Sequence, residues 1–96
     1  MAGQNHPSHT LADKLFSRLR SLKANNLHGE CYQAAAQALG LSELAQQFER
    51  INGIQDREGH LPHDVYHERH RAYQQLLQSA RSRLSIEQYN KLYMCF

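Results

Sequence analysis

The sequence predicts an all-α fold, a compact bundle of about five helices within a single domain. Apolar residues recur at steps of three and four along most of the chain, which is the period of an amphipathic helix. Ala, Leu, Gln, Glu and Arg are abundant whereas Val, Ile and Thr are scarce, a composition that favours helices over strands. A chain of 96 residues is long enough for one core, although a thin one.

The first two helices are delimited by a threonine and a glycine. We expect residues 1–9 to form a flexible N-terminal arm, ahead of a single helical domain that spans the rest of the chain. Helix one is predicted over 10–25, because the hydroxyl of Thr10 can cap its first turn. Helix two is predicted over 28–39, because Gly40 suits the left-handed backbone that commonly ends a helix.

The third helix is expected to be short. Ser42 can cap its start, and the pair Asn52-Gly53 is typical of a helix end, so we predict helix three over 42–52. The hydrophilic stretch 55–60 is then predicted to be a loop.

The last two helices carry clear start signals. Helix four is predicted over 62–82, because Pro62 fits a first helical turn, where the missing N–H has no cost. Helix five is predicted over 85–95, because Ser85 and Gln88 have the spacing of a capping box.

The charge is weak overall but unevenly distributed. The net charge is +2 with histidine neutral, and segments 1–27, 28–64 and 65–96 carry +3, −4 and +3. This alternation suits the packing of like chains against each other and does not resemble one nucleic-acid footprint. We therefore expect no nucleic-acid partner.

The cysteines and the first residues indicate the cellular compartment in which we expect the protein. Cys31 and Cys95 are far apart and form no CxxC pair, so nothing predicts a disulfide framework. The first residues lack the pattern of a signal peptide, and no apolar run approaches the length of a membrane span. We expect a cytoplasmic protein with reduced thiols and no membrane partner.

Four histidines fall within eleven residues, at His60, His63, His67 and His70. At about 100° per residue, the last three lie along one margin of the predicted apolar line of helix four. That line comprises Tyr66, Tyr73, Leu77, Ala80 and Leu84. We interpret the histidines as half-buried residues at the margin of this helix where the apolar face meets solvent.

A metal site and a pH sensor are the alternatives for these histidines. His63 and His67 are four residues apart, a spacing that lets two imidazoles reach one ion. However, Asp64 stands where the HExxH motif has glutamate, and a structural zinc site needs four ligands. We therefore expect no resident metal and no cofactor, and keep a histidine-dependent metal-binding module as a second alternative. Close histidines would also repel one another when charged.

Residues 32–52 resemble a helix-turn-helix. Ala36, Leu39, Gly40 and Leu41 stand where that motif has a small residue, an apolar residue, the turn glycine and another apolar residue. The resemblance implies a DNA-binding regulator, which is the first alternative function. The pattern departs from the motif at Gln46 and Glu49, which replace apolar residues, and the acidic second helix suits a phosphate-lined groove poorly. A simple pair of helices explains the same residues.

No catalytic pattern is present in the sequence. It has no glycine-rich phosphate loop and no GxSxG motif, so we expect neither an enzyme nor a small-molecule substrate. The prediction is an accessory or regulatory protein that acts by protein–protein association, as a homodimer. The expected interaction surface lies at the apolar C-terminus and comprises Tyr89, Leu92, Tyr93 and Phe96.

Overall fold

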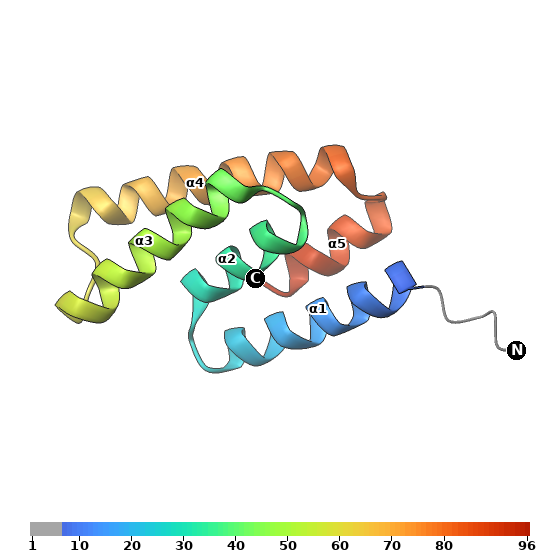
Figure 1. The fold of residues 1–96 in the computed structure, drawn as a ribbon, viewed down its shortest axis with the longest axis horizontal. Helices are drawn as coiled ribbons and strands as arrows, with labels where there is room; N and C mark the ends of the chain where they lie inside the picture. The colour runs from blue at the N-terminus through green and yellow to red at the C-terminus, as the bar shows by residue number, and fades with distance from the viewer. Residues whose placement is uncertain (1–6) are drawn as a thin grey trace, which may run out of the picture.

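The computed structural model describes residues 7–96, and for residues 7–12 the backbone alone. This part of the chain forms five helices and no strand (Figure 1). They are α1 (Pro7–Ala24), α2 (His28–Ala38), α3 (Ser42–Glu58), α4 (His63–Arg83) and α5 (Ile86–Met94). The predicted all-α bundle of about five helices is confirmed.

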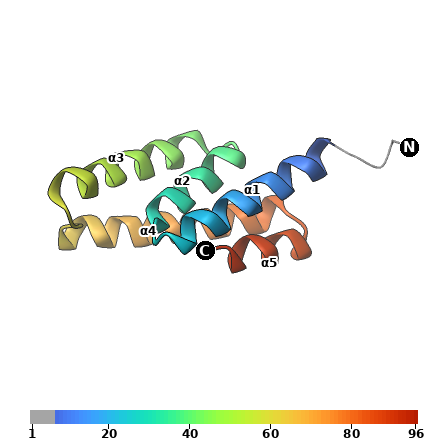
Figure 2. The same cartoon turned by 90° about the horizontal axis from the view of Figure 1, so that it is seen from below.

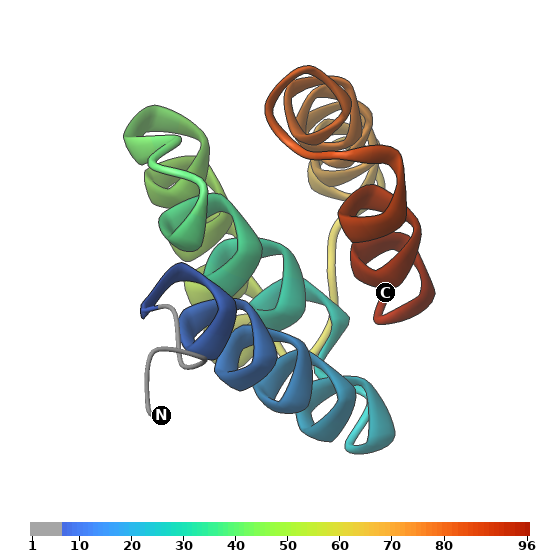
Figure 3. The same cartoon turned by 90° about the vertical axis from the view of Figure 1, so that its right-hand side faces the viewer.

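The helices form two layers, as the view along the long axis shows (Figure 3). One layer contains α1, α2 and α3, and the other contains α4 and α5. The short helix α2 contacts α1, α3 and α4, so it is the centre of the fold. The molecule is elongated, with extents of 51 × 26 × 21 Å, because α3 and α4 run side by side along its length (Figures 1 and 2).

Small side chains allow α2 to occupy this central position. Ala35 and Ala36 are fully buried, and Ala34 is nearly so. Gly29 is buried against α3, where an added Cβ would overlap the side chain of Asn52. The close approach of α2 and α3 therefore depends on residues that have little or no side chain.

The core is thin and contains few large residues. The largest side chains that are fully buried are those of Phe48, Leu19, Ile51, Leu76, Leu92 and Cys31. They come from all five helices, and all of them except Ile51 belong to one continuous cluster.

Two sequence signals mark helix ends where we predicted them. Gly40 has a φ of 74° and follows α2, as expected of a left-handed glycine stop. Ser85 caps α5: its hydroxyl accepts from the Gln88 N–H at 3.2 Å, and the Gln88 side chain accepts from the Ser85 N–H. α2, α4 and α5 begin and end within a residue or so of the predicted bounds.

The predicted end of helix three is wrong. α3 passes through Asn52 and Gly53 without a break and ends at Glu58, so most of the expected loop 55–60 is helical. The stop is Gly59, which has a φ of 80°. Tertiary contacts explain the continuation, because the Asn52 amide donates to Gln33 of α2 at 2.9 Å and neighbouring Ile51 is fully buried.

The first helix also differs from its prediction. α1 begins at Pro7 and ends at Ala24, so it starts three residues before Thr10 and overlaps the expected arm 1–9. Proline is favoured at a first helical position, which explains the earlier start. Residues 1–6 of that arm lie outside the described residues.

The buried face of α4 is rotated from the predicted line. Ala80 of the predicted line is buried, and Tyr73, Leu77 and Leu84 are half-buried, but Tyr66 is 51% exposed. The other buried residues of α4, Ala72 and Leu76, lie outside that line. The buried line lies roughly 80° around the helix from Tyr66, at about 100° per residue. Two large tyrosine rings dominated the predicted pattern, whereas two of the three buried residues are alanines.

Candidate interaction surface

The inner face of α5 is anchored to the rest of the domain. Leu92 is 1% exposed and belongs to the core. Cys95, which follows the helix, is buried and donates a long Sγ contact to the Phe16 carbonyl of α1 at 3.8 Å. The Lys23 ammonium reaches the Met94 carbonyl at 3.4 Å. These contacts fix the C-terminal end of α5 against α1.

The terminal residue Phe96 completes a cluster of aromatic rings. Its ring meets the rings of Tyr32 and Tyr73 at centroid distances of 5.4 and 5.6 Å, both edge to face. Tyr32 and Tyr73 lie 4.6 Å apart. Burial raises the pKa of Tyr73 to about 12, because the phenolate would lose its hydration there, and it also raises the pKa of Tyr32.

The predicted interaction residues therefore divide into two groups. Leu92 is buried in the core, and Phe96 is half-buried against it within the aromatic cluster. Tyr93 is 53% exposed, and Tyr89 is half-buried with its ring stacked on that of Tyr93 at 6.3 Å. The guanidinium of Arg81 lies 5.6 Å from the centre of the Tyr89 ring and covers it from α4.

Two further apolar residues belong to the exposed side of α5. Ile86 is 77% exposed and Met94 is 75% exposed. They were missed because an apolar pattern does not show which of two neighbouring arcs faces inward. We call Ile86, Tyr93 and Met94 the outer face of α5. Among the described side chains, the other large exposed hydrophobic residues are Leu27 and Tyr66.

A groove between α1 and α5 continues this outer face. Met94 and Asn90 line it from α5, and Phe16 and Arg20 line it from α1. Because Met94 belongs to both the groove and the outer face, the apolar surface extends from one onto the other.

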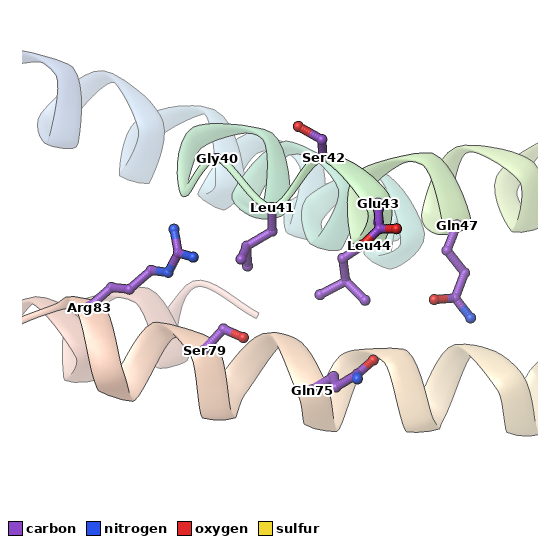
Figure 4. Close-up of a pocket in the computed structure, with 9 residues that line it drawn as sticks. All are labelled: Gly40, Leu41, Ser42, Glu43, Leu44, Gln47, Gln75, Ser79 and Arg83. Atoms are coloured by element: carbon purple, nitrogen blue, oxygen red, sulfur yellow. The ribbon is translucent and has the colours of Figure 1, made fainter.

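A second groove lies between α3 and α4 and is more polar (Figure 4). Leu41 and Leu44 point from the start of α3 toward Gln75 and Ser79 of α4. At one end, Arg83 donates from Nη1 to the Leu39 carbonyl at 2.7 Å and so closes the end of α2. That interaction gives Arg83 a structural role.

In the helix-turn-helix candidate, the basic residue Arg50 pairs with another residue of the same chain. Arg50 of α3 forms an ion pair with Glu68 of α4, and the Gln47 amide donates to the same carboxylate at 3.0 Å. Acidic residues outnumber basic ones along α3, which carries Glu43, Glu49, Asp56 and Glu58 against Arg50 and Arg57. This charge balance disfavours contact with a phosphate backbone.

The histidines lie on the exposed side of α4. His63, His67 and His70 are all exposed, since the buried face of α4 is turned away from them. The Nε2 atoms of His63 and His67 are 3.1 Å apart. Within the described residues, no group of three or more His, Cys, Asp or Glu side chains is arranged to hold a metal ion.

Comparisons of the chain with protein-family models, curated proteins and solved structures found no match. Along residues 7–96, none of the helices combines the length and apolarity needed to cross a membrane.

Proposed function

We propose that this chain is a small, non-enzymatic accessory or regulatory protein of the cytoplasm that acts by protein–protein association. In this proposal it forms a two-fold homodimer through the outer face of α5. The observation that carries the proposal is the exposure of Ile86, Tyr93 and Met94 on a helix of nine residues.

The chemistry of this surface suits a protein partner. Burial of apolar surface contributes roughly 25 cal/mol per Å², so three large side chains in water are a substantial unused source of binding free energy. Aromatic residues and methionine are enriched at interfaces between proteins. Charged side chains are also present beside this surface, because Glu87 and Lys91 are exposed on the same helix.

The surface is self-complementary if two copies of α5 pack antiparallel. Ile86 stands near the start of the helix, and Tyr93 and Met94 stand near its end. A two-fold axis at the middle of the helix would place Ile86 of each copy against Tyr93 of the other. The same axis would bring Glu87 of one copy close to Lys91 of the second. Two-fold dimers, in which the same patch serves both subunits, are the commonest soluble oligomers.

The thiols support the non-enzymatic, cytoplasmic part of the proposal. Cys31 and Cys95 are free and buried. Burial raises the pKa of the Cys31 thiol, with the neighbouring Cys95 as a smaller contribution, so Cys31 is a poor nucleophile. Buried, reduced cysteines are typical of structural residues in a reducing compartment.

Light scattering of the purified chain tests the association. The wild type is expected to have twice the mass of one chain at tens of micromolar, and the double variant Tyr93→Ala with Met94→Ala is expected to be a monomer. Tyr66→Ala is a matched control, because Tyr66 is 51% exposed and Tyr93 is 53% exposed. A wild-type monomer would refute the homodimer, and a double variant that remains dimeric would place the interface elsewhere.

A charge swap tests the antiparallel arrangement. Glu87→Lys would place like charges together in the dimer and should weaken it, whereas Glu87→Lys with Lys91→Glu should restore it. Exposed ion pairs contribute about 0.2–1 kcal/mol each, and a two-fold dimer contains two of them. Dissociation constants from sedimentation would measure the effect. Equal constants for the single variant and the wild type would contradict this arrangement.

A further inference from the structure

We propose that His63 and His67 form a two-histidine chelate for a transition-metal ion such as Ni²⁺, Cu²⁺ or Zn²⁺. The site is open and is filled from solution, so it is distinct from a resident metal centre. It lies on α4, whereas the proposed dimer surface lies on α5, and neither proposal depends on the other.

The distance between the two imidazoles carries the inference. Their Nε2 atoms are 3.1 Å apart, with ring centroids at 4.4 Å and ring planes at 87°. Bonds of about 2.0–2.1 Å from both nitrogens to one ion would then give an angle of roughly 100° at the metal. That angle lies between the octahedral and tetrahedral values, so one ion can bond to both nitrogens without a change in the backbone.

The present contact between the rings is a hydrogen bond, and a metal would replace it. In the neutral pair, one Nε2–H donates to the other Nε2. To bind a metal, the donating ring moves its proton to Nδ1, which leaves two neutral imidazoles with a free Nε2 lone pair each. Each lone pair must also turn by about 40° from the line between the nitrogens, given bonds of that length. Both side chains are exposed, so the rings have room to turn.

The surroundings indicate a labile site. Only two protein ligands are available within the described residues, so water completes the coordination. The positive end of the α4 dipole lies at His63, the first residue of the helix, and weakens the attraction for a cation. The carboxylate of Asp64 in the same turn opposes that effect.

The ligand type selects the class of ion. Imidazole nitrogen suits zinc, copper and nickel, whereas Mg²⁺ and Ca²⁺ take oxygen ligands. The two ligands stand on successive turns of one helix, so a bound ion also cross-links the first turns of α4. Metal binding is therefore expected to stabilise the folded state by mass action.

Titration of the full, untagged chain with NiCl₂, followed residue by residue by NMR, tests the site. We expect amide signals around His63 and His67 to broaden at the lowest Ni²⁺ concentrations, and MgCl₂ to have no effect. ZnCl₂ in excess should raise the melting temperature of the wild type by several degrees. Signals near other histidines that broaden first, or no response at all, would overturn the proposal.

Single variants complete the test. His63→Ala and His67→Ala should each abolish the early broadening and the thermal shift. His60→Ala and His70→Ala are the controls, because both residues are exposed in the same segment and should leave both effects intact. Circular dichroism verifies that each variant remains helical. If all four variants behave alike, the ring pair is a hydrogen bond only and the proposal fails.

Discussion

At the scale of single residues, the ring of Tyr73 couples the aromatic cluster to pH. It packs against both Tyr32 and Phe96, and burial raises its pKa from 10.0 to about 12. Between pH 10 and pH 12 the folded state keeps a proton that the unfolded state has lost. The stabilisation from this group is therefore fully present below pH 10 and is lost as the pH rises through that window.

The variant Tyr73→Phe is expected to flatten the fall of the unfolding free energy between pH 10 and pH 12. Urea denaturation at several pH values would measure it. Tyr66→Phe is the control, since Tyr66 lies exposed on the same helix. Some slope should remain in Tyr73→Phe, because burial also raises the pKa of Tyr32. Identical slopes in Tyr73→Phe and the wild type would contradict the packing of this ring against Tyr32 and Phe96.

Single residues also show which sequence signals were reliable. Gly40 and Ser85 act through the local backbone, so their roles could be read from the sequence. The roles of Leu92 and Ile86 could not, because both belong to an apolar helix. Which of them turns inward depends on packing against α4 and α1, and α1 lies more than sixty residues earlier in the chain.

At the scale of elements, the length of α3 decides how α3 and α4 connect. The sequence Asn52-Gly53 resembles a stop, yet the helix continues for another turn and a half to Glu58. A glycine inside a helix costs about 1 kcal/mol relative to alanine, a cost that tertiary contacts can offset. Here the contacts of Ile51 and Asn52 offset it. Sequence periodicity alone does not include such contacts.

Two glycine substitutions test this length. Gly53→Ala should stabilise the protein by about 0.5–1 kcal/mol, since alanine is the better helix former. Its new methyl group would meet only the mobile end of the Arg57 side chain. Gly59→Ala should destabilise by about 1–2 kcal/mol, because Gly59 has a φ of 80°. Chemical denaturation would measure both values. Destabilisation by Gly53→Ala would show that α3 ends where the sequence suggested.

The face of α4 was misjudged for a related reason. Tyr66 and Tyr73 have large apolar rings, so they dominated the predicted core line. The buried residues are Ala72, Leu76 and Ala80, of which only Ala80 was on the predicted line. This rotation also explains why the histidines are fully on the exposed side rather than at a half-buried edge.

At the scale of the whole molecule, the thin core protects the two cysteines unequally. Cys31 lies on the central helix α2 and is fully buried, with its thiol donating to the Leu19 carbonyl at 3.4 Å. Cys95 is 3% exposed and follows α5, a helix of nine residues at the periphery that packs mainly against α4. A short peripheral helix can open locally at low free energy, whereas a central helix opens only with the whole domain.

A thiol reagent should therefore modify Cys95 faster than Cys31 in the native protein. The rate at Cys31 should follow the free energy of global unfolding as urea is added, and the rate at Cys95 should respond less. Mass spectrometry of peptides after timed labelling would resolve the two sites. Equal rates at both cysteines would contradict a separate opening of α5.

At the scale of the whole molecule, we propose that the outer face of α5 meets the same face of a second copy. Isotope-filtered NMR on a mixture of labelled and unlabelled chains tests it most directly, because this experiment detects contacts between copies only. The proposed dimer should give cross-peaks between Ile86 of one copy and Tyr93 or Met94 of the other. A spectrum without cross-peaks between copies at tens of micromolar, or with cross-peaks only from other helices, would contradict it.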